Sequence, residues 1–252
     1  MTINKAVVEI RNVDFAYDDI LVLKDITLTI EEGNFLGIVG PNGSGKTTFL
    51  RHLNGLLLPD TGAVRLAGVP VSRDIPRARQ MVGMVFQDAD SQIVGETVFD
   101  DVAFGPENLC LDECEVKRRV IKSLKAVGLI DIADQRPHLL SGGEKRRLAV
   151  AGILAMESRI LVFDEPFSDL DYPGVRQILH QTLSLHKAGH TILIATHDLE
   201  KVIAHADRLL IMSDGKVVMD NAPEMIIKDV EAFGVREPCT SRLGMEIESW
   251  LN

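Results

Sequence analysis

A glycine-rich stretch, GPNGSGKT, occupies residues 40–47. Its spacing is typical of a P-loop when a strand precedes it and a helix follows, as the flanking patterns predict here. Glycines allow successive backbone N–H groups to point at phosphate oxygens, and the following helix N-terminus adds a favourable dipole. We expect Lys46 to reach the β- and γ-phosphates of a nucleotide and Thr47 to hold Mg²⁺. The nucleotide-binding residues expected in this stretch are Gly40, Asn42, Gly43, Ser44, Gly45, Lys46, Thr47 and Thr48.

Two adjacent carboxylates, Asp164 and Glu165, follow the apolar run ILVF at residues 160–163. In an open α/β sheet, ligands bind at the carboxyl ends of the strands. We expect Asp164 to hold Mg²⁺ directly or through water, and Glu165 to polarise the attacking water. Taken alone, the pair would fit a solvated loop better. Its occurrence together with a P-loop favours the catalytic interpretation.

A second stretch typical of a phosphate-binding helix start, LSGGE, occupies residues 140–144. Ser141 and Glu144 have the spacing of a capping box, which only begins a helix, and the KRR that follows reads as a solvated basic segment. Gly142 and Gly143 need a further reason, because each costs up to about 1 kcal/mol relative to Ala in a helix interior. Adjacent glycines leave backbone N–H groups open to an anion. We therefore interpret Ser141, Gly142 and Gly143 as a second phosphate clamp.

The elements that must position these motifs alternate along the chain. Strands are predicted at residues 7–13, 25–30, 35–39, 63–66, 81–86, 160–163, 191–195, 208–212 and 216–219. A helix is predicted at about 46–56, and residues 96–154 are mostly helical in pattern. Within that block, Asp112 and Glu115 have capping-box spacing at the start of a helix that Gly128 ends. Alternating strands and helices indicate a parallel sheet covered by helices, with the helical block inserted into it.

Composition narrows the class of protein. The 252 residues, 46% of them hydrophobic and 25% charged, suit one large globular domain or a core with a subdomain. A net charge of −10 argues against a surface built mainly to bind nucleic acid. Three cysteines, Cys110, Cys114 and Cys239, suggest free thiols in a reducing compartment. No signal peptide or bilayer-spanning run is visible, so we expect a soluble chain that could reach a membrane through a partner.

In their order, these motifs resemble those of the ATP-binding-cassette (ABC) ATPases. The resemblance covers about residues 7–220 and includes Gln87 after a strand, the turn SDLD at 168–171 and His197 in ATHD. It implies an α/β fold with a P-loop NTPase core, an N-terminal antiparallel β subdomain and an inserted α-helical subdomain. The core with its β subdomain would comprise residues 1–86 and 156–220, the insertion residues 87–155, and a C-terminal tail residues 221–252.

The resemblance also assigns roles beyond those argued from the residues. Two cassettes, identical or different, would face head to tail, so that the P-loop of one and the LSGGE of the other enclose one ATP. Gln87 would contact Mg²⁺ or the attacking water, and His197 would stabilise the γ-phosphate in the transition state. Tyr17 would stack on adenine, with a buried core tyrosine as the alternative. Asp171 would join the subunit contact, whereas Asp169 stands where the family usually carries a small residue.

Residues 87–109, QDADSQIVGETVFDDVAFGPENL, resemble more narrowly the ATPases of energy-coupling-factor (ECF) importers. Those systems import vitamins and transition-metal ions such as cobalt or nickel. Asp88, Ala89 and Ser91 differ from the Asn, Pro and Asn usual there. The resemblance implies an ATPase subunit on the cytoplasmic face of the cell membrane that drives import through separate integral membrane subunits docked on this region. We expect exposed apolar side chains for a partner helix at Ile93, Val94, Val98 and Phe99, and buried ones at Val102 and Phe104.

Two other classes of protein remain open as alternatives. A soluble ABC ATPase of DNA repair, translation or cluster assembly would usually add coiled coils, zinc modules or a second cassette, and we see one cassette. A non-catalytic nucleotide-binding scaffold would be expected to lack Lys46, Glu165 or His197, all of which are present. The transported solute and the choice between homodimer and heterodimer stay open.

Overall fold

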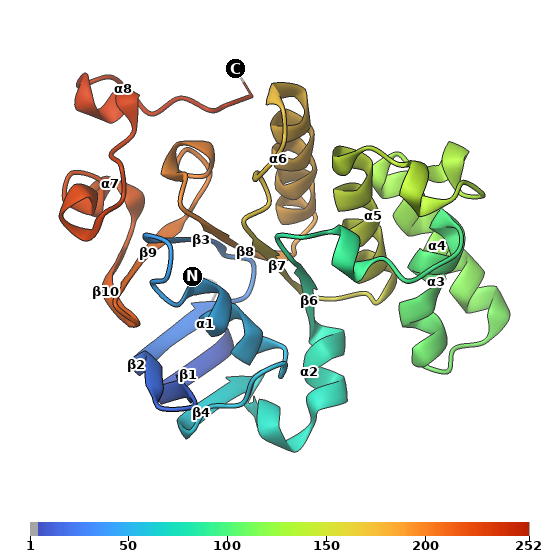
Figure 1. Ribbon diagram of the computed structural model, residues 1–252, viewed down its shortest axis with the longest axis horizontal. Coiled ribbons are helices and arrows are strands. Elements are labelled where there is room, and N and C mark those ends of the chain that lie inside the picture. The colour runs from blue at the N-terminus through green and yellow to red at the C-terminus, as the bar shows by residue number, and fades with distance from the viewer. Residues whose placement is uncertain (1–4, 252) are drawn as a thin grey trace.

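The computed structural model describes residues 5–251, and their strands form two sheets (Figure 1). The antiparallel sheet has the strand order β2-β1-β4-β5, with bounds Ile20–Glu31, Ala6–Tyr17, Thr61–Leu66 and Val69–Pro70. The second sheet has the order β10-β9-β3-β8-β7-β6, with bounds Lys216–Asn221, Arg208–Ser213, Phe35–Val39, Thr191–Thr196, Ile160–Asp164 and Val82–Val85. All its neighbours pair in parallel except β10 and β9. The predicted antiparallel subdomain and parallel core are both present.

The central strands β3, β7 and β8 are buried along their whole length, as a sheet covered on both faces requires. Alternate side chains of β3 enter two different cores. Leu36 and Ile38 pack with helix α1 (Lys46–Leu53) and the antiparallel sheet. Phe35 and Val39 belong to the core that includes the helical insertion. The parallel sheet therefore joins both halves of the molecule.

The helical insertion lies beside the parallel sheet (Figure 1). Its helices α3, α4 and α5 pack against one another, with bounds Val98–Asn108, Glu113–Val127 and Gly142–Ala155. The remaining α-helices are α2, α6, α7 and α8, with bounds Ile75–Met81, Tyr172–Lys187, Pro223–Ile226 and Cys239–Arg242. No helix within residues 5–251 combines the length and the hydropathy needed to cross a membrane.

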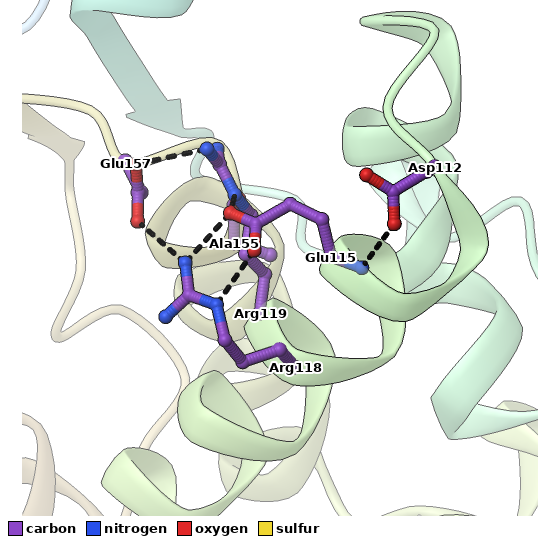
Figure 2. Close-up of polar contacts among 6 residues, drawn as sticks. All are labelled: Asp112, Glu115, Arg118, Arg119, Ala155 and Glu157. Atoms are coloured by element: carbon purple, nitrogen blue, oxygen red, sulfur yellow. Dashed lines mark hydrogen bonds and ion pairs between the residues drawn. The ribbon is translucent and has the colours of Figure 1, made fainter.

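Helix α4 begins where the sequence predicts, but with different side-chain contacts. Asp112 accepts a hydrogen bond from the Glu115 N–H at 3.0 Å. Capping-box spacing predicts that the Glu115 carboxylate accepts a hydrogen bond from the backbone of Asp112. The carboxylate instead pairs with Arg118 and Arg119 (Figure 2). Hydrogen bonds from these two guanidinium groups lower the pKa of Glu115 to about 2. Both arginines also pair with Glu157, which ties α4 to the end of α5.

The hairpin of β1 and β2 is longer than its apolar pattern predicts. Acidic residues interrupt that pattern, yet they stabilise irregularities in the pairing of the two strands. Asp25, with a φ of 50°, donates its N–H to the Asp14 carboxylate at 2.8 Å. The Asn12 side-chain amide donates to the Asp25 carboxylate at 2.9 Å. The hairpin therefore continues past these residues, and Tyr17 is the last residue of β1.

Candidate active site

The glycine-rich loop joins β3 to α1 at the carboxyl edge of the parallel sheet. Gly43 and Gly45 have φ values of 81° and 98°, in the left-handed region that glycine adopts without strain. A Cβ on Gly40 would lie 2.2 Å from the carbonyl oxygen of Met212 in β9. The glycines of the motif therefore meet two geometric needs, a left-handed turn and a close approach to the neighbouring strand.

Lys46 is buried at the start of α1, and its ammonium donates to the carbonyl oxygens of Gly40 at 2.7 Å and Pro41 at 3.1 Å. Burial lowers the pKa of Lys46, and two nearby carboxylates oppose that shift. Ser44 Oγ is buried in the same loop and has no hydrogen-bond partner among the described residues. A buried ammonium bonded to neutral carbonyls and an orphaned buried hydroxyl fit an anionic ligand such as a nucleotide phosphate chain.

Thr47 and Asp164 lie side by side, with Thr47 Oγ1 donating to Asp164 Oδ1 at 3.1 Å. Asp164 is 3% exposed, and this burial raises the pKa of its carboxyl. Gln87, from the loop after β6, lines a cavity of about 560 Å³ together with both. Hard oxygen ligands of this kind suit Mg²⁺ when substrate phosphates complete its coordination. The three residues expected to hold Mg²⁺ are therefore brought together, and their role as ligands stays a prediction.

Glu165 and His197 form a hydrogen-bonded pair, with 3.0 Å between Glu165 Oε2 and His197 Nδ1. Glu165 directly follows β7, and its φ of 49° places a non-glycine residue in the left-handed region. Its N–H donates to the Ala195 carbonyl at 2.9 Å, which helps to hold that conformation. Such strain, maintained by surrounding contacts, is concentrated at functional sites. Glu165 is 8% exposed, whereas the His197 side chain is 58% exposed, so the histidine lies nearer to solvent.

A buried arginine links the loops around this site. Arg146 is 5% exposed, and its guanidinium donates to the carbonyls of Gln87, Pro166 and Ser168 at 2.8, 2.6 and 2.9 Å. Burial lowers its pKa. The interpretation of the KRR segment as solvated is therefore wrong for this residue. The available signal was its place four residues after Gly142, which puts both on one face of a helix.

The second glycine-bearing stretch caps α5 as predicted. The Ser141 N–H and hydroxyl donate to the Glu144 carboxylate at 2.8 and 2.7 Å, and the Glu144 N–H donates back to Ser141 Oγ at 3.3 Å. The bond from the hydroxyl contributes most to lowering the pKa of Glu144. A Cβ on Gly142 or Gly143 would meet nothing within 4 Å, so packing inside this chain does not require either glycine. Among residues 5–251, no hydrogen bond joins this helix start to the P-loop.

Three further positions named from the resemblance lie in loops or at element ends. Tyr17 is 41% exposed, and its ring packs edge-on against Phe15 at 4.9 Å between centroids. The alternative of a buried core tyrosine is therefore wrong, and adenine stacking stays a prediction. Asp171 caps α6 by accepting the Gly174 N–H at 3.0 Å, and Asp169 has a φ of 59°.

Residues 87–109 expose a different set of apolar side chains from the set predicted. Val98 is fully buried, because it shares one face of α3 with the buried Val102. Phe104 is 54% exposed, although we expected it to pack, because it lies on the opposite face of that helix. Val94 is 61% exposed, as predicted. Two other predicted positions are only partly exposed, Ile93 and Phe99.

With this geometry established, comparison with known proteins decides the family. Residues 23–168 match the family described as ABC transporter. The chain belongs to this family. It is 43% identical over 231 residues to the energy-coupling factor transporter ATP-binding protein EcfA of Methanocaldococcus jannaschii, which covers 90% of this chain and 83% of that protein. It is 42% identical over 224 residues to the cobalt import ATP-binding protein CbiO of Syntrophus aciditrophicus, covering 87% and 80% respectively.

A solved ABC structure agrees in fold over almost the whole chain. This structure, described as cbiO1 from Clostridium perfringens and part of the ABC transporter complex cbiONQ, has a TM-score of 0.82. The two chains are 34% identical, and the match covers 95% of this chain and 97% of the other. The predicted ABC ATPase fold, the ATPase class and the narrower resemblance to ECF and cobalt-import ATPases are therefore confirmed. The individual site residues and the limits of the subdomains stay predictions.

Proposed function

We propose that this ABC ATPase hydrolyses ATP between two head-to-tail cassettes and thereby energises solute import through a separate membrane protein. The observation that carries the proposal is the Glu165–His197 pair, held at 3.0 Å beside the Thr47–Asp164 contact. A carboxylate, a histidine and a hydroxyl at the ends of buried strands, next to a P-loop, provide the groups needed for attack of water on a phosphate.

The phosphate chain is bound by this chain's own loop in the proposal. The backbone N–H groups of residues 40–47, the Ser44 hydroxyl and the Lys46 ammonium supply hydrogen bonds and positive charge. Mg²⁺ held by Thr47, Asp164 and Gln87 would neutralise part of the phosphate charge.

Glu165 accepts a proton from the attacking water, since its carboxylate projects from the strand end that also carries Asp164. The contact with His197 Nδ1 fixes the orientation of that carboxylate. To donate to the γ-phosphate at the same time, the ring must also carry a proton on its other nitrogen, Nε2. Because the histidine is the more exposed partner, it can reach a nucleotide while Glu165 stays in place.

Ser141, Gly142 and Gly143 serve the ATP bound to the neighbouring cassette. The open space at both glycines supports this, because neither is needed for packing within the chain. The capping box fixes the start of α5 while leaving the N–H groups of its first turn toward the outside. A phosphate approaching from a second cassette would find a helix N-terminus with no side chains in its way.

Mixing two inactive variants tests the shared site. Glu165→Gln removes the base of the P-loop site, whereas Gly143→Val obstructs the LSGGE helix start at a position where an added Cβ meets nothing within 4 Å in the monomer. In a head-to-tail dimer of one copy of each, both lesions fall in the same ATP site and the other site is intact. Each variant alone should therefore be inactive, and a mixture should regain ATPase activity.

The arrangement within one chain predicts the opposite result. If LSGGE served its own P-loop, the two lesions would occupy different sites and the mixture would stay inactive. Size-exclusion chromatography of Glu165→Gln with ATP and Mg²⁺ is the accompanying control, because this variant should accumulate as a dimer. A monomer that hydrolyses ATP as fast as the dimer would contradict the shared site.

Solute import is proposed from the relatives together with the surface at residues 87–109. The relatives named above are an ECF transporter subunit and a cobalt importer subunit, so we propose a transition-metal ion such as cobalt or nickel, or a vitamin, as the solute. The proposed location is the cytoplasmic face of the cell membrane. A cavity of about 660 Å³ beside the exposed Val94 offers room for a membrane partner's helix. Its lining combines apolar, acidic and basic groups, including Ile93, Glu96, Arg136 and Lys145.

Co-purification after mild detergent extraction tests this part. The chain should be recovered with integral membrane proteins, and Val94→Asp should reduce that recovery while ATP binding is retained. The equally exposed Met225→Asp, in α7 and away from this cavity, is a matched control. Recovery of the wild-type chain only in the soluble fraction would favour a soluble ABC ATPase.

A further inference from the structure

We infer that the C-terminal segment positions the catalytic loops, with Lys201 and Trp250 as positioning residues for the Glu165–His197 pair. Neither residue belongs to a motif named above. The inference rests on the roles proposed for Glu165 and His197. It rests on a chain of contacts that connects the tail with the segments after Glu165, Asp171 and His197.

Lys201 is the centre of this chain of contacts. It ends the short helical turn η5 (Leu199–Lys201), four residues after His197. Its ammonium pairs with the Asp198 carboxylate at 2.9 Å and lies 5.6 Å from the centroid of the Phe167 ring. Phe167 is 4% exposed and comes two residues after Glu165. Lys201 therefore joins the segment after Glu165 to the segment after His197.

Trp250 covers this lysine from the tail. The Lys201 ammonium lies 5.6 Å from the centroid of the Trp250 ring, so the cation is within cation–π distance of both aromatic rings. The Trp250 ring also contacts the Tyr172 ring at 5.6 Å between centroids. Tyr172 is the first residue of α6, directly after the cap residue Asp171. One indole thus contacts the start of α6 and the turn after His197.

Polar contacts hold the tail in this position. Arg176 of α6 donates to the Leu251 carbonyl at 2.8 Å, and its guanidinium lies over the Tyr172 ring. The Ser249 hydroxyl bonds to His205 Nε2 at 3.0 Å. Figure 1 shows the chain end returning beside α6 after passing through α8. These contacts flank Trp250 on both sides in the sequence, so the indole is held at this place rather than resting on it by chance.

The position of these contacts predicts a selective effect on turnover. The segments held by the stack follow Glu165, His197 and Asp171, whereas the P-loop takes no part in it. Loosening the stack should allow the base and the histidine to leave their productive geometry while the phosphate cradle stays intact. Since small displacements of catalytic groups reduce rates strongly, kcat should fall while KM for ATP changes little.

Steady-state ATPase assays of the full chain test the inference. Trp250→Ala and Lys201→Met should each lower kcat at least about fivefold, with KM for ATP within about twofold of wild type. Trp250→Phe keeps a ring and Lys201→Arg keeps the charge, so both should retain most of kcat. Leu243→Ala changes a side chain in the same tail that is 74% exposed, and serves as the matched control with unchanged kcat.

Fluorescence gives a second readout, because Trp250 is the only tryptophan in the sequence. Lys201→Met should shift the indole emission if the cation contacts the ring, and thermal unfolding should show that the variant is folded. The inference is overturned if Trp250→Ala and Lys201→Met keep wild-type kcat, or if KM rises as much as kcat falls. A failure of the proposed base is seen separately, as normal turnover in Glu165→Gln.

Discussion

Replacing Arg146 by methionine keeps a long side chain but removes the guanidinium that joins α5 to the loops of the site. The carbonyls of Gln87, Pro166 and Ser168 lose donors at 2.8, 2.6 and 2.9 Å. Hydrogen bonds to a charged group contribute about 1.5–3 kcal/mol each, or about 4.5–9 kcal/mol for three. Burying the cation costs several kcal/mol, which offsets part of this sum. We therefore expect the free energy of unfolding to fall by about 3 kcal/mol.

Urea denaturation followed by circular dichroism measures this loss. Arg146→Lys should recover little of it, because an ammonium on a shorter stem cannot reach three carbonyls as a planar guanidinium does. Arg147→Met is the matched control, because the neighbouring Arg147 guanidinium has a single hydrogen-bonded side-chain partner within residues 5–251, the exposed Gln177. That control should cost less than about 1 kcal/mol. A loss for Arg146→Met no larger than for Arg147→Met would refute the reasoning that its three bonds hold the loops.

Glu165→Gln keeps the size of the side chain but cannot accept a proton, so kcat should fall about 10²–10⁴-fold, while calorimetry should show that ATP binding is retained. Gly40→Ala should abolish nucleotide binding in the same titration, because its Cβ would lie 2.2 Å from the Met212 carbonyl oxygen. Binding that persists unchanged would mean that the loop can shift without loss. Asp164→Asn should raise the melting temperature near neutral pH in the absence of nucleotide. Burial raises the pKa of Asp164 in the folded protein above its value in the unfolded chain. Protonation of Asp164 therefore stabilises the fold. This stabilisation is complete below the unfolded pKa and is lost as pH rises through the folded pKa. The advantage of the asparagine should therefore shrink as pH falls through the raised folded pKa, and should stay constant below about 4, where the acid is protonated in both states. A lower melting temperature for the variant near neutral pH would contradict this sign.

The parallel core could be predicted closely because its strands are continuous apolar runs bounded by glycine or acidic residues. β3 begins and ends as predicted, and β7 exceeds its prediction only by Asp164. Helix α4 was also predicted, and Gly128 ends it with a φ of 70°. The helix after the P-loop ends at Leu53 rather than near residue 56. The β1–β2 hairpin was underestimated, because Asp14 and its neighbours resemble turn residues until their backbone partners are known.

The residues of the candidate site also divide into those that the sequence predicted and those that it did not. Motif residues could be named because their spacing is local and their chemistry is specific. Arg146 was missed, because its place on the same helix face as Gly142 does not reveal partners that lie 20 to 59 residues away, and its burial depends on how the insertion packs. Lys201 and Trp250 were missed for that reason too. At Val98 and Phe104 the helix was correctly predicted, but its rotation about its own axis was not, and that rotation decides which side chains a partner can contact.

Arg146 connects two roles that we assign to helix α5. Its N-terminus carries Gly142, which we assign to the neighbouring cassette's phosphate. One turn later, the guanidinium holds the backbone of Gln87 and of the residues that follow Glu165, which we assign to this chain's own ATP. A 14-residue helix packed against α3 and α4 moves as a rigid element, so a shift of its N-terminus toward a second cassette must displace those carbonyls or break three hydrogen bonds. The start of α5 is therefore mechanically linked to the Gln87 loop and to the loop after Glu165. In the proposed shared-site arrangement, occupation of one ATP site should alter the geometry of the other.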